Sequence, residues 1–500
     1  MAIMTTIAAR LAPACALALA AACWLGAVPP AQAAPGAAWV DPVFPGLGSR
    51  SYDALGYDLA FDYRDLTRTV DATATITAHS RQALQRVELD ALGLDVHSVQ
   101  VDGRPATFTT GGEKLLVTPE HPVPADRTLT VTVAYSADPH ASDLPHTGWV
   151  PTADGFAVAG QPNSAHTVFP CNDRPDDKAP FTVRVTAPDG LLGVAGGTPT
   201  GVSEQGGRTT RSYEYRDPMA TELLQVSVGR AELRERQGPA GLPIRDVVPV
   251  SRAAALEPAL ALTPGQLGWL EQRLGDFPFE TYGLLPVDTD DPDAFGFTGL
   301  ETQTLTLYKP NFLLQPEPKI GSHMMHELVH SWFGNSVTPS SWSDLWLNEG
   351  HADFYGLQYR YERGWPDSLG LTTLDARMKD TYAKGDQWRQ DSGPVAAPNA
   401  ADLFDEQRYL GGVLVLYALR EKVGAPTFER IERTYLSRYR NGSAGTQEYL
   451  ATASEVAGQD LHAFLTDWLY GTRTPPMPGH PDWTVTPARQ PSPHPVRTSD

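Results

Sequence analysis

The sequence predicts an α+β fold with two main domains, an N-terminal antiparallel β-saddle or sandwich followed by a mostly α-helical domain. Two observations support this prediction. Residues 39–236 contain many short runs in which apolar and polar side chains alternate, whereas from residue 237 onward apolar residues recur at helical spacing. A chain of 500 residues is also too long for one ordinary hydrophobic core. We therefore expect a β-domain at residues 39–236 and a helical domain at residues 237–474.

The two ends of the chain differ in composition from these domains. Residues 1–34 combine the positive charge of Arg10, an apolar run rich in Ala and Leu, and the small-residue cleavage pattern Ala31-Gln32-Ala33. This arrangement predicts a signal peptide cut near Ala33 and a secreted protein, with a retained membrane anchor as the alternative. Residues 475–500 are rich in proline and are expected to be unstructured.

Charge and cysteine content restrict the partners and the chemistry. A net charge of −20 argues against nucleic acid and anionic membranes as partners, because both bind basic surfaces. Removal of the signal peptide would leave Cys171 as the one cysteine, so no internal disulfide can form. Cys171 is interpreted as a small buried apolar residue and not as a nucleophile. The sequence does not indicate an oligomeric state.

Alternation and helical spacing place the individual elements. Strands are expected at residues 57–63, 70–77, 129–135, 181–185, 223–228 and 298–307. Helices are expected at residues 263–274, 404–423, 430–439 and 461–470. In the first of these helices, Thr263 is expected as the N-cap and Pro264 at the first helical position.

The stretch from His323 to Tyr355 contains the pattern His326-Glu327-Leu328-Val329-His330. On a helix, His326 and His330 project from one face about one turn apart and can share a metal ion. Glu327 follows the first histidine directly, where it can act on a water bound to that metal without being a ligand. The pattern also arises by chance in unrelated proteins, but here apolar residues surround it and a suitable third ligand follows. These residues predict a hydrolytic Zn²⁺ site.

Glu349 is the third expected ligand. Eighteen residues separate it from His330, which is enough for the end of one helix, a turn at residues 338–341 and the start of a second helix that returns across the first. Three protein ligands leave the fourth tetrahedral position for water, as a catalytic zinc site requires. Asp353 is placed to accept a hydrogen bond from the second nitrogen of a zinc-bound histidine, and a hydrated surface aspartate is an equally good interpretation.

Two further polar residues lie in apolar surroundings. Glu301 belongs to the otherwise uncharged expected strand 298–307, where a carboxylate either faces water at a sheet edge or awaits a cationic group of a substrate. Tyr409 by itself is interpreted as a core tyrosine of the expected helix 404–423. In that helix, the pair Gly411-Gly412 indicates a close approach by another segment.

Several of these segments together closely resemble the M1 family of zinc aminopeptidases. The resemblance spans about residues 50–470 and rests on the zinc motif and on these further segments: Phe169-Pro170-Cys171-Asn172-Asp173, Phe277-Pro278-Phe279, Trp332-Phe333-Gly334-Asn335 and Asp344-Leu345-Trp346-Leu347-Asn348-Glu349-Gly350. It implies an N-terminal β-saddle, a thermolysin-like catalytic domain and one bound Zn²⁺ ion.

The resemblance also implies roles for individual residues. The family's three zinc ligands and its general base match four residues already described, His326, His330, Glu349 and Glu327. Glu301 matches the acidic residue that holds the free α-amino group of the substrate. Tyr409 matches the tyrosine that stabilises the oxyanion, and Gln161 resembles a substrate-pocket residue.

The sequence departs from the family pattern in three respects. The segment around Glu301 reads Thr298-Gly299-Leu300-Glu301-Thr302, where the family motif is usually G-x-M-E-N. Gly411 stands where the family usually has a lysine. Many members also continue into a large helical domain that closes over the cleft, and this chain is too short to include one, so a more open cleft is expected.

The sequence and the resemblance together predict a secreted zinc aminopeptidase that acts on peptides with a free N-terminus. A thermolysin-like zinc endopeptidase is the first alternative, because it uses the same metal site without needing Glu301. A non-catalytic secreted binding protein that retains the fold is the second alternative. The preferred N-terminal residue is not encoded in any one segment, because the side-chain pocket is assembled from distant parts of the chain.

Overall fold

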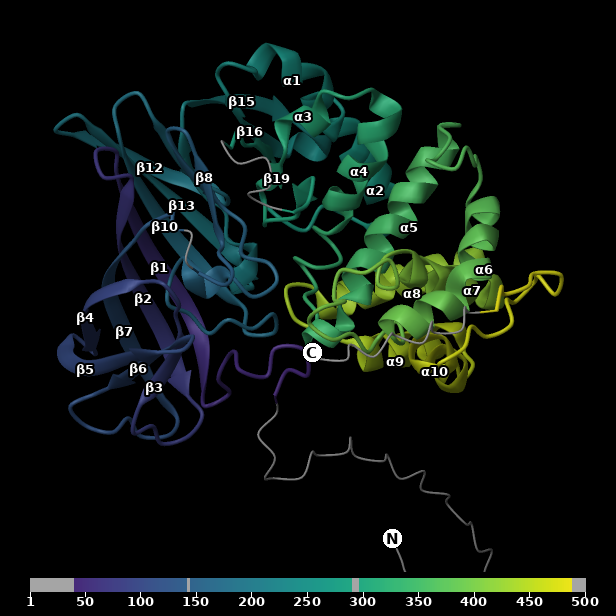
Figure 1. Ribbon diagram of the computed structural model, residues 1–500, viewed down its shortest axis with the longest axis horizontal. Coiled ribbons are helices and arrows are strands. Elements are labelled where there is room, and N and C mark those ends of the chain that lie inside the picture. The colour runs from purple at the N-terminus through teal and green to yellow at the C-terminus, as the bar shows by residue number, and fades with distance from the viewer. Residues whose placement is uncertain (1–39, 142–143, 290–295, 488–500) are drawn as a thin grey trace, which may run out of the picture. The chain divides into compact units, whose positions relative to one another are not determined.

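The computed structural model describes residues 40–141, 144–289 and 296–487 (Figure 1), and these residues belong to a compact unit that begins at Val40. The predicted signal peptide at residues 1–34 and the last part of the predicted tail, residues 488–500, lie outside the described residues. None of the helices formed by the described residues combines the length and the apolar composition that a membrane span requires.

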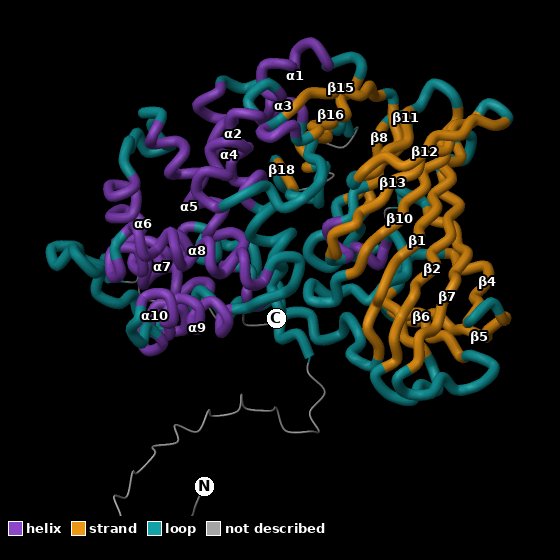
Figure 2. Tube along the Cα trace, turned by 180° about the vertical axis from the view of Figure 1, so that it is seen from behind, coloured by secondary structure: helices purple, strands orange, loops and turns teal. Residues whose placement is uncertain are grey.

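The first part of the described chain is built on a ten-stranded sheet, as the alternating pattern predicts (Figure 2). The strand order is β12-β13-β10-β1-β2-β7-β4-β5-β6-β3. The bounds are β1 Tyr52–Arg64, β2 Thr69–Ser80, β3 Val87–Asp90, β4 Asp95–Val101, β5 Arg104–Gly111, β6 Lys114–Thr118, β7 Arg127–Ala137, β10 Ala179–Pro188, β12 Thr198–Gln205 and β13 Arg208–Met219. Burial alternates along β1 and β2 because successive side chains of a strand point to opposite faces of the sheet.

One pair in this sheet departs from the antiparallel expectation. Among the described strands of the sheet, β1 and β10 pair in parallel, with Tyr57 opposite Phe181, and the other neighbours are antiparallel. Parallel neighbours need a long connection that returns the chain to the same end of the sheet. The hairpins and the long loop between β1 and β10 supply it, and that loop contains Gln161.

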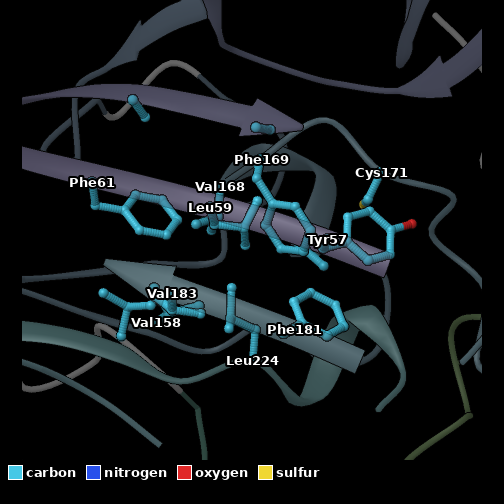
Figure 3. Packing of buried hydrophobic residues seen from close by; sticks show 14 of the residues in the cluster. Tyr57, Leu59, Phe61, Val158, Val168, Phe169, Cys171, Phe181, Val183 and Leu224 are labelled. Atoms are coloured by element: carbon cyan, nitrogen blue, oxygen red, sulfur yellow. The ribbon is translucent and has the colours of Figure 1, made fainter. Parts of the chain in front are cut away.

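A second, smaller sheet packs with the first and completes the predicted sandwich. Its strands follow the order β11-β14-β9-β8, with bounds β8 Trp149–Thr152, β9 Gly155–Val158, β11 Leu192–Ala195 and β14 Val226–Gly229. Figure 3 shows Tyr57 of β1 and Phe181 of β10 in the shared core, with their rings stacked 4.6 Å apart, and Val158 of β9 nearby. Cys171 is a free, fully buried thiol in the same core, so its interpretation as an apolar residue is confirmed.

A hairpin connects the β-rich part to the helical part. It consists of β15 Ala231–Gln237 and β16 Pro243–Pro249, so the predicted boundary after residue 236 falls inside β15. Val247 packs in the core of the sandwich, whereas Val248 packs in the core of the helical part. The hairpin therefore contributes side chains to both cores, because adjacent residues of a strand face opposite sides.

The second part of the described chain is mostly helical, as expected. A small sheet with the order β17-β19-β18 follows the first two helices of this part and precedes the others, with bounds β17 Leu284–Pro286, β18 Gly299–Leu300 and β19 Thr306–Tyr308. The helices are α1 Ala253–Leu260, α2 Thr263–Leu274, α3 Pro310–Leu313, α4 Glu317–Val329, α5 Trp346–Glu362, α6 Leu374–Ser392, α7 Leu410–Val423, α8 Ala425–Tyr439, α9 Thr446–Ala457 and α10 His462–Tyr470.

Helix α2 matches its predicted range, but Leu262 and not Thr263 takes the N-cap position. Helix α1 ends two residues before Leu262, and Leu262 itself has helical angles, φ −75° and ψ −29°. Because the two helices follow each other so closely, Thr263 is drawn into the first turn and its side chain makes no capping bond. The predicted helices 430–439 and 461–470 correspond to α8 and α10.

Helix α7 begins at Leu410, so the predicted start at residue 404 is wrong. The preceding segment is held outside the helix by the buried Arg408, whose guanidinium donates to the carbonyl oxygens of Ser392 and Pro394. These bonds tie the segment to the end of α6. Tyr409 consequently occupies the N-cap position of α7 and not its interior.

The proline-rich tail is partly ordered, which corrects the prediction for residues 475–487. Met477 and Trp483 are buried, and the Trp483 ring stacks on Tyr417 of α7 with centroids 5.9 Å apart. The hydroxyl of Tyr382 in α6 donates to the carbonyl oxygen of Pro475. Apolar side chains between the prolines give this segment enough buried surface to pack on α6 and α7.

Candidate metal centre

Two helices bring the three predicted ligands together. His326 lies in α4, and His330 follows the last residue of α4 with helical angles, φ −56° and ψ −24°, so both imidazoles lie on one face. Their Nε2 atoms are 3.2 Å apart. Glu349 lies in the first turn of α5, and its Oε2 atom is 3.3 Å from Nε2 of His326 and 3.6 Å from Nε2 of His330. All three side chains are buried.

These separations fit a tetrahedral zinc ion. Zinc bonds of about 2.0–2.2 Å to nitrogen and oxygen place neighbouring ligand atoms about 3.3–3.6 Å apart. Two neutral imidazoles and a carboxylate are also a donor set that zinc accepts in catalytic sites, where a fourth position stays open for water. The residues present therefore fit the predicted metal.

Glycines allow the helices that carry the ligands to approach closely. A Cβ atom added to Gly356 of α5 would lie 3.0 Å from the carbonyl oxygen of Ser322 in α4. A Cβ atom added to Gly412 of α7 would lie 2.9 Å from Cα of Gly350 in α5. The close approach predicted for the Gly411-Gly412 pair is thus confirmed at Gly412, and it fixes α7 beside the helix that carries Glu349.

The second nitrogen of each histidine has its own partner. Nδ1 of His326 is 2.8 Å from Oδ1 of Asp353, one turn after Glu349 on α5. Nδ1 of His330 is 3.1 Å from the carbonyl oxygen of Phe333. These contacts orient both rings so that Nε2 faces the metal position, which is how proteins commonly fix zinc-bound histidines. Of the two interpretations of Asp353, the structure supports the hydrogen-bonding one.

The charges of the ligands are tightly coupled. Burial alone would raise the pKa of Glu349, but His330 and His326 hold it at about 2 through their charges and hydrogen bonds. Burial lowers the pKa of His330, and the carboxylates of Glu301 and Glu349 outweigh that effect and raise it to about 9. The histidines must lose these protons before they can bind a cation, so metal uptake is linked to proton release.

Glu327 faces the same space but lies beside the ligands. Its Oε1 atom is 3.2 Å from Nε2 of His323, one turn earlier on α4. Burial raises the pKa of Glu327 to about 8, with Glu301 adding to the rise and the histidines opposing it. A Cβ atom added to Gly299 would lie 2.6 Å from Oε1 of Glu327, so the glycine leaves room for the carboxylate in its present position.

Glu301 is buried beside the metal centre, but it does not lie in a strand. The predicted strand 298–307 is wrong, because β18 ends at Leu300 and the chain turns before β19 begins at Thr306. Thr304 has a left-handed φ of 65°, and its hydroxyl oxygen accepts a hydrogen bond from the backbone N–H of Gly197 in the β-sandwich. This contact with a distant segment holds the turn, so the local alternation of apolar and polar residues could not reveal that the strand is interrupted.

Two amides fix the position of Glu301. Nε2 of Gln161 donates to Oε1 of Glu301 at 2.6 Å, and Nδ2 of Asn335 donates to its backbone carbonyl at 2.6 Å. Oε1 of Glu301 is 3.8 Å from Nδ1 of His330. Gln161 comes from the loop that precedes β10, so the β-rich part contributes a residue to the site.

Tyr409 lies against the metal ligands from the start of α7. Its ring is stacked parallel to the His326 imidazole, with centroids 6.0 Å apart. Burial raises the pKa of the Tyr409 hydroxyl well above its usual value, and the surrounding carboxylates, Glu349 first, add to this effect. At Gly411, where the family usually has a lysine, an added Cβ would lie 2.6 Å from Oε1 of Gln407, so there is little room for a longer side chain.

A cavity of about 620 Å³ opens beside these residues. Its wall includes His323 and His326 of α4 and Asp353 of α5, and also Leu410, the first residue of α7, and Glu406 from the segment before that helix. A volume of this order is typical of ligand pockets in proteins. The cavity therefore meets the metal centre at His326, while Glu301, Glu327 and Tyr409 are not among its lining residues.

Sequence reasoning missed two residues of this site. His323 precedes Glu327 by one helical turn, and this spacing was a usable signal for the contact between them. Asn335 follows the metal motif in sequence, but its bond to the backbone of Glu301 depends on how the loop between β18 and β19 folds. Gln161 was found through the family resemblance alone, because nothing in its own segment indicates chemistry.

Comparison with family models supports the same architecture. Residues 260–468 match the model of the peptidase family M1 domain, and residues 53–223 match the model of the peptidase M1 N-terminal domain. The chain is similar to leucine aminopeptidase 2 of Aspergillus niger, with 24% identity over 84% of this chain and 71% of that protein. It is also similar to human glutamyl aminopeptidase, with 27% identity over 62% of this chain and 33% of that protein.

Two solved structures are similar to this chain over nearly the whole of their own length. A variant of an M1 zinc metallopeptidase from Deinococcus radiodurans, bound to a Tyr-Ser-Ala substrate, superposes with a TM-score of 0.75 at 29% identity, covering 88% of this chain and 99% of that chain. A structure of a two-domain M1 zinc metallopeptidase variant bound to L-arginine has a TM-score of 0.74 at 29% identity, covering 88% of this chain and 98% of that chain.

Proposed function

The chain belongs to the M1 family of zinc metallopeptidases, and from this premise we propose that it hydrolyses the N-terminal peptide bond of peptides with a free α-amino group. The observation that carries the proposal is the position of Glu301, whose buried carboxylate lies 3.8 Å from the imidazole of His330. A carboxylate fixed there attracts an ammonium group and so aligns the first residue of a peptide across the metal centre. The aminopeptidase names of the fungal and human relatives support this assignment.

Each step of the hydrolysis has a residue suited to it. Zinc held by the three predicted ligands would supply a Lewis acid that can polarise the scissile carbonyl and lower the pKa of water. Glu327, whose pKa of about 8 the positive charge of a bound ion would lower, accepts the proton of the attacking water and later delivers it to the leaving amine. The Tyr409 hydroxyl donates a hydrogen bond to the oxyanion that develops on the carbonyl oxygen. Burial keeps the pKa of Tyr409 high, so that its hydroxyl retains the proton it must donate.

The amides around Glu301 support its role as an anchor. Gln161 and Asn335 hold the carboxylate and the backbone of Glu301 from two sides. A group fixed in this way loses little conformational freedom when it binds the substrate. Cleavage then falls after the first residue, because a peptide bound with its second residue at the anchor would have no α-ammonium group there to pair with Glu301.

The decisive experiment compares a panel of amino-acid anilides with their N-acetylated counterparts, with and without a zinc chelator. We expect chelator-sensitive cleavage of the free-amine panel alone, and the rates will rank the side chains accepted at the first position. Comparable cleavage of the blocked panel would favour a thermolysin-like endopeptidase and remove the role of Glu301. Zinc-loaded protein that cleaves neither panel would favour a binding protein.

We also propose that the protein is exported and that its signal peptide, within residues 1–34, is cleaved just after Ala33. The support is the charged, apolar and small-residue order of that segment. N-terminal sequencing of protein recovered from the culture medium should give a chain that begins just after Ala33. Recovery of the chain only from inside the cell with its first residues intact would contradict the proposal.

A further inference from the structure

Three potential ligands converge in the β-rich part of the chain, on elements separate from those that hold the predicted zinc ligands. Glu113 lies in the turn between β5 and β6, His146 in the loop before β8, and His166 in the short helix η1, Ala165–Thr167. Nε2 of His146 is 3.2 Å from Oε1 of Glu113, and Nε2 of His166 is 3.9 Å from Oε2 of the same carboxylate. The three ligand atoms lie within 4.8 Å of one another.

His166 presents a buried nitrogen that the protein does not use. Its side chain is 0% exposed, and within the described residues its Nε2 atom has no hydrogen-bond partner. Leaving a buried imidazole nitrogen without a hydrogen bond costs about 1–3 kcal/mol. Such an atom aimed at a carboxylate and a second imidazole is placed as a metal ligand would be.

The other nitrogen of each imidazole is held by the protein. Nδ1 of His166 is 2.7 Å from Oδ2 of Asp173, and Nδ1 of His146 is 3.2 Å from Oγ of Ser164. This repeats the arrangement at the predicted zinc site, where the Nδ1 atoms face Asp353 and the carbonyl oxygen of Phe333. In both clusters the partners at Nδ1 turn Nε2 towards the other ligands.

We propose that Glu113, His146 and His166 form a second divalent-metal site, with Zn²⁺ as the preferred ion. Imidazole nitrogen and carboxylate oxygen are donors that zinc accepts, and a tetrahedral ion places ligand atoms about 3.3–3.6 Å apart. The contacts of 3.2 and 3.9 Å run to the two different oxygens of Glu113, and one ligand atom from each residue lies within 4.8 Å of the others, close enough for one ion to draw them together. Glu113 is 40% exposed and His146 is 24% exposed, so an ion can enter from solvent and keep a water ligand.

A metal at this position adds a direct link between three segments, two of which the contact between His146 and Ser164 already joins. These segments are the β5–β6 turn, the loop before β8, and the stretch from Gln161 to Asp173. Asp173 also accepts a hydrogen bond from the hydroxyl of Thr221. The site therefore acts structurally, by fixing the loop that carries Gln161 towards Glu301.

Metal content tests the proposal without any activity measurement. The intact chain is stripped with a chelator, reloaded with zinc, freed of excess ion by gel filtration and analysed by mass spectrometry. The wild type should retain two zinc ions per chain, one at each site. Glu113→Gln and His146→Gln should each retain one, because both remove a ligand but leave the buried His166 in place. The exposed His97→Gln is the matched control and should retain two.

A thermal measurement separates binding at this site from binding elsewhere. Addition of zinc to the stripped protein should raise Tm more for the wild type and for His97→Gln than for His146→Gln, because a ligand that binds only the folded state stabilises it. A wild type that retains a single zinc ion would overturn the proposal and leave the cluster as a set of ion pairs. Retention of two ions by both Glu113→Gln and His146→Gln would also overturn it.

Discussion

The proposed role of Glu301 is tested most directly by Glu301→Gln. The substitution keeps the shape of the side chain and an oxygen that can accept the 2.6 Å hydrogen bond from Gln161, but it removes the negative charge. Removing one charge of a buried, hydrogen-bonded ion pair costs about 3–5 kcal/mol. Because about 1.36 kcal/mol corresponds to a factor of ten in rate, we expect kcat/KM for free-amine substrates to fall by about 2 × 10²- to 5 × 10³-fold.

The assay measures kcat/KM of the variant and the wild type on an amino-acid anilide and on its N-acetylated form. The zinc content should be equal in both proteins, which separates loss of the anchor from loss of the metal. Glu204→Gln removes the same charge from an exposed position on β12 and should leave both rates unchanged. If Glu301→Gln keeps more than a tenth of the wild-type rate, or keeps the full preference for the free amine, the anchor assignment is wrong.

Four further outcomes follow from the site. Glu327→Gln should keep its zinc and its fold but lose about 10²- to 10⁴-fold in kcat, as expected for a general base; turnover near the wild-type rate would remove that role. Tyr409→Phe should lower kcat by about 10²- to 10³-fold with little change in KM, and a change in KM alone would argue against oxyanion stabilisation. Gly299→Ala should lower kcat and destabilise the fold by about 1–3 kcal/mol, because its Cβ would lie 2.6 Å from Oε1 of Glu327; a variant with normal kcat and normal Tm would show that the carboxylate has room to move. Burial lowers the pKa of Lys178 from 10.5 to about 7, so unfolding takes up a proton between these values and the wild type gains stability as pH rises through that interval. Chemical denaturation should therefore show the wild type gaining about 4 kcal/mol relative to Lys178→Met between pH 7 and 10, and a pH-independent difference would contradict the buried-amine interpretation.

The convergence of the three predicted ligands could be expected from sequence because their geometry is local. His326 and His330 need only one helical turn, and Glu349 needs only a second helix that packs on the first. The same holds for the strands of the sandwich, where alternation over several residues reflects one buried face. In each case the spacing of the residues in the sequence matches the face that the structure buries.

The failed predictions share a different physical cause. The turn that carries Glu301 is held by Gly197, and the segment before α7 is held outside the helix by Arg408. Gly197 lies far from this turn in the chain. Arg408 bonds to the end of α6, outside the helix that it precedes. Residues 475–487 likewise pack because Tyr417 and Trp483 stack, which composition alone did not reveal. Tertiary contacts override local propensity at these places.

The structure also indicates why the metal motif alone does not determine exopeptidase specificity. The zinc ligands and Glu327 come from α4, its C-cap and α5, whereas Gln161, which bonds the proposed anchor Glu301, comes from the β-rich part. Lys178, at the edge of β10, donates to the carbonyl oxygen of Asn335, and the Asn335 side chain in turn donates to the backbone of Glu301. The helical part therefore supplies the predicted hydrolytic centre, while contacts from the sandwich fix the carboxylate that we propose selects a free amine. A change in the sandwich that disturbs Gln161 or Lys178 should alter the preference for free amines before it alters the hydrolysis itself.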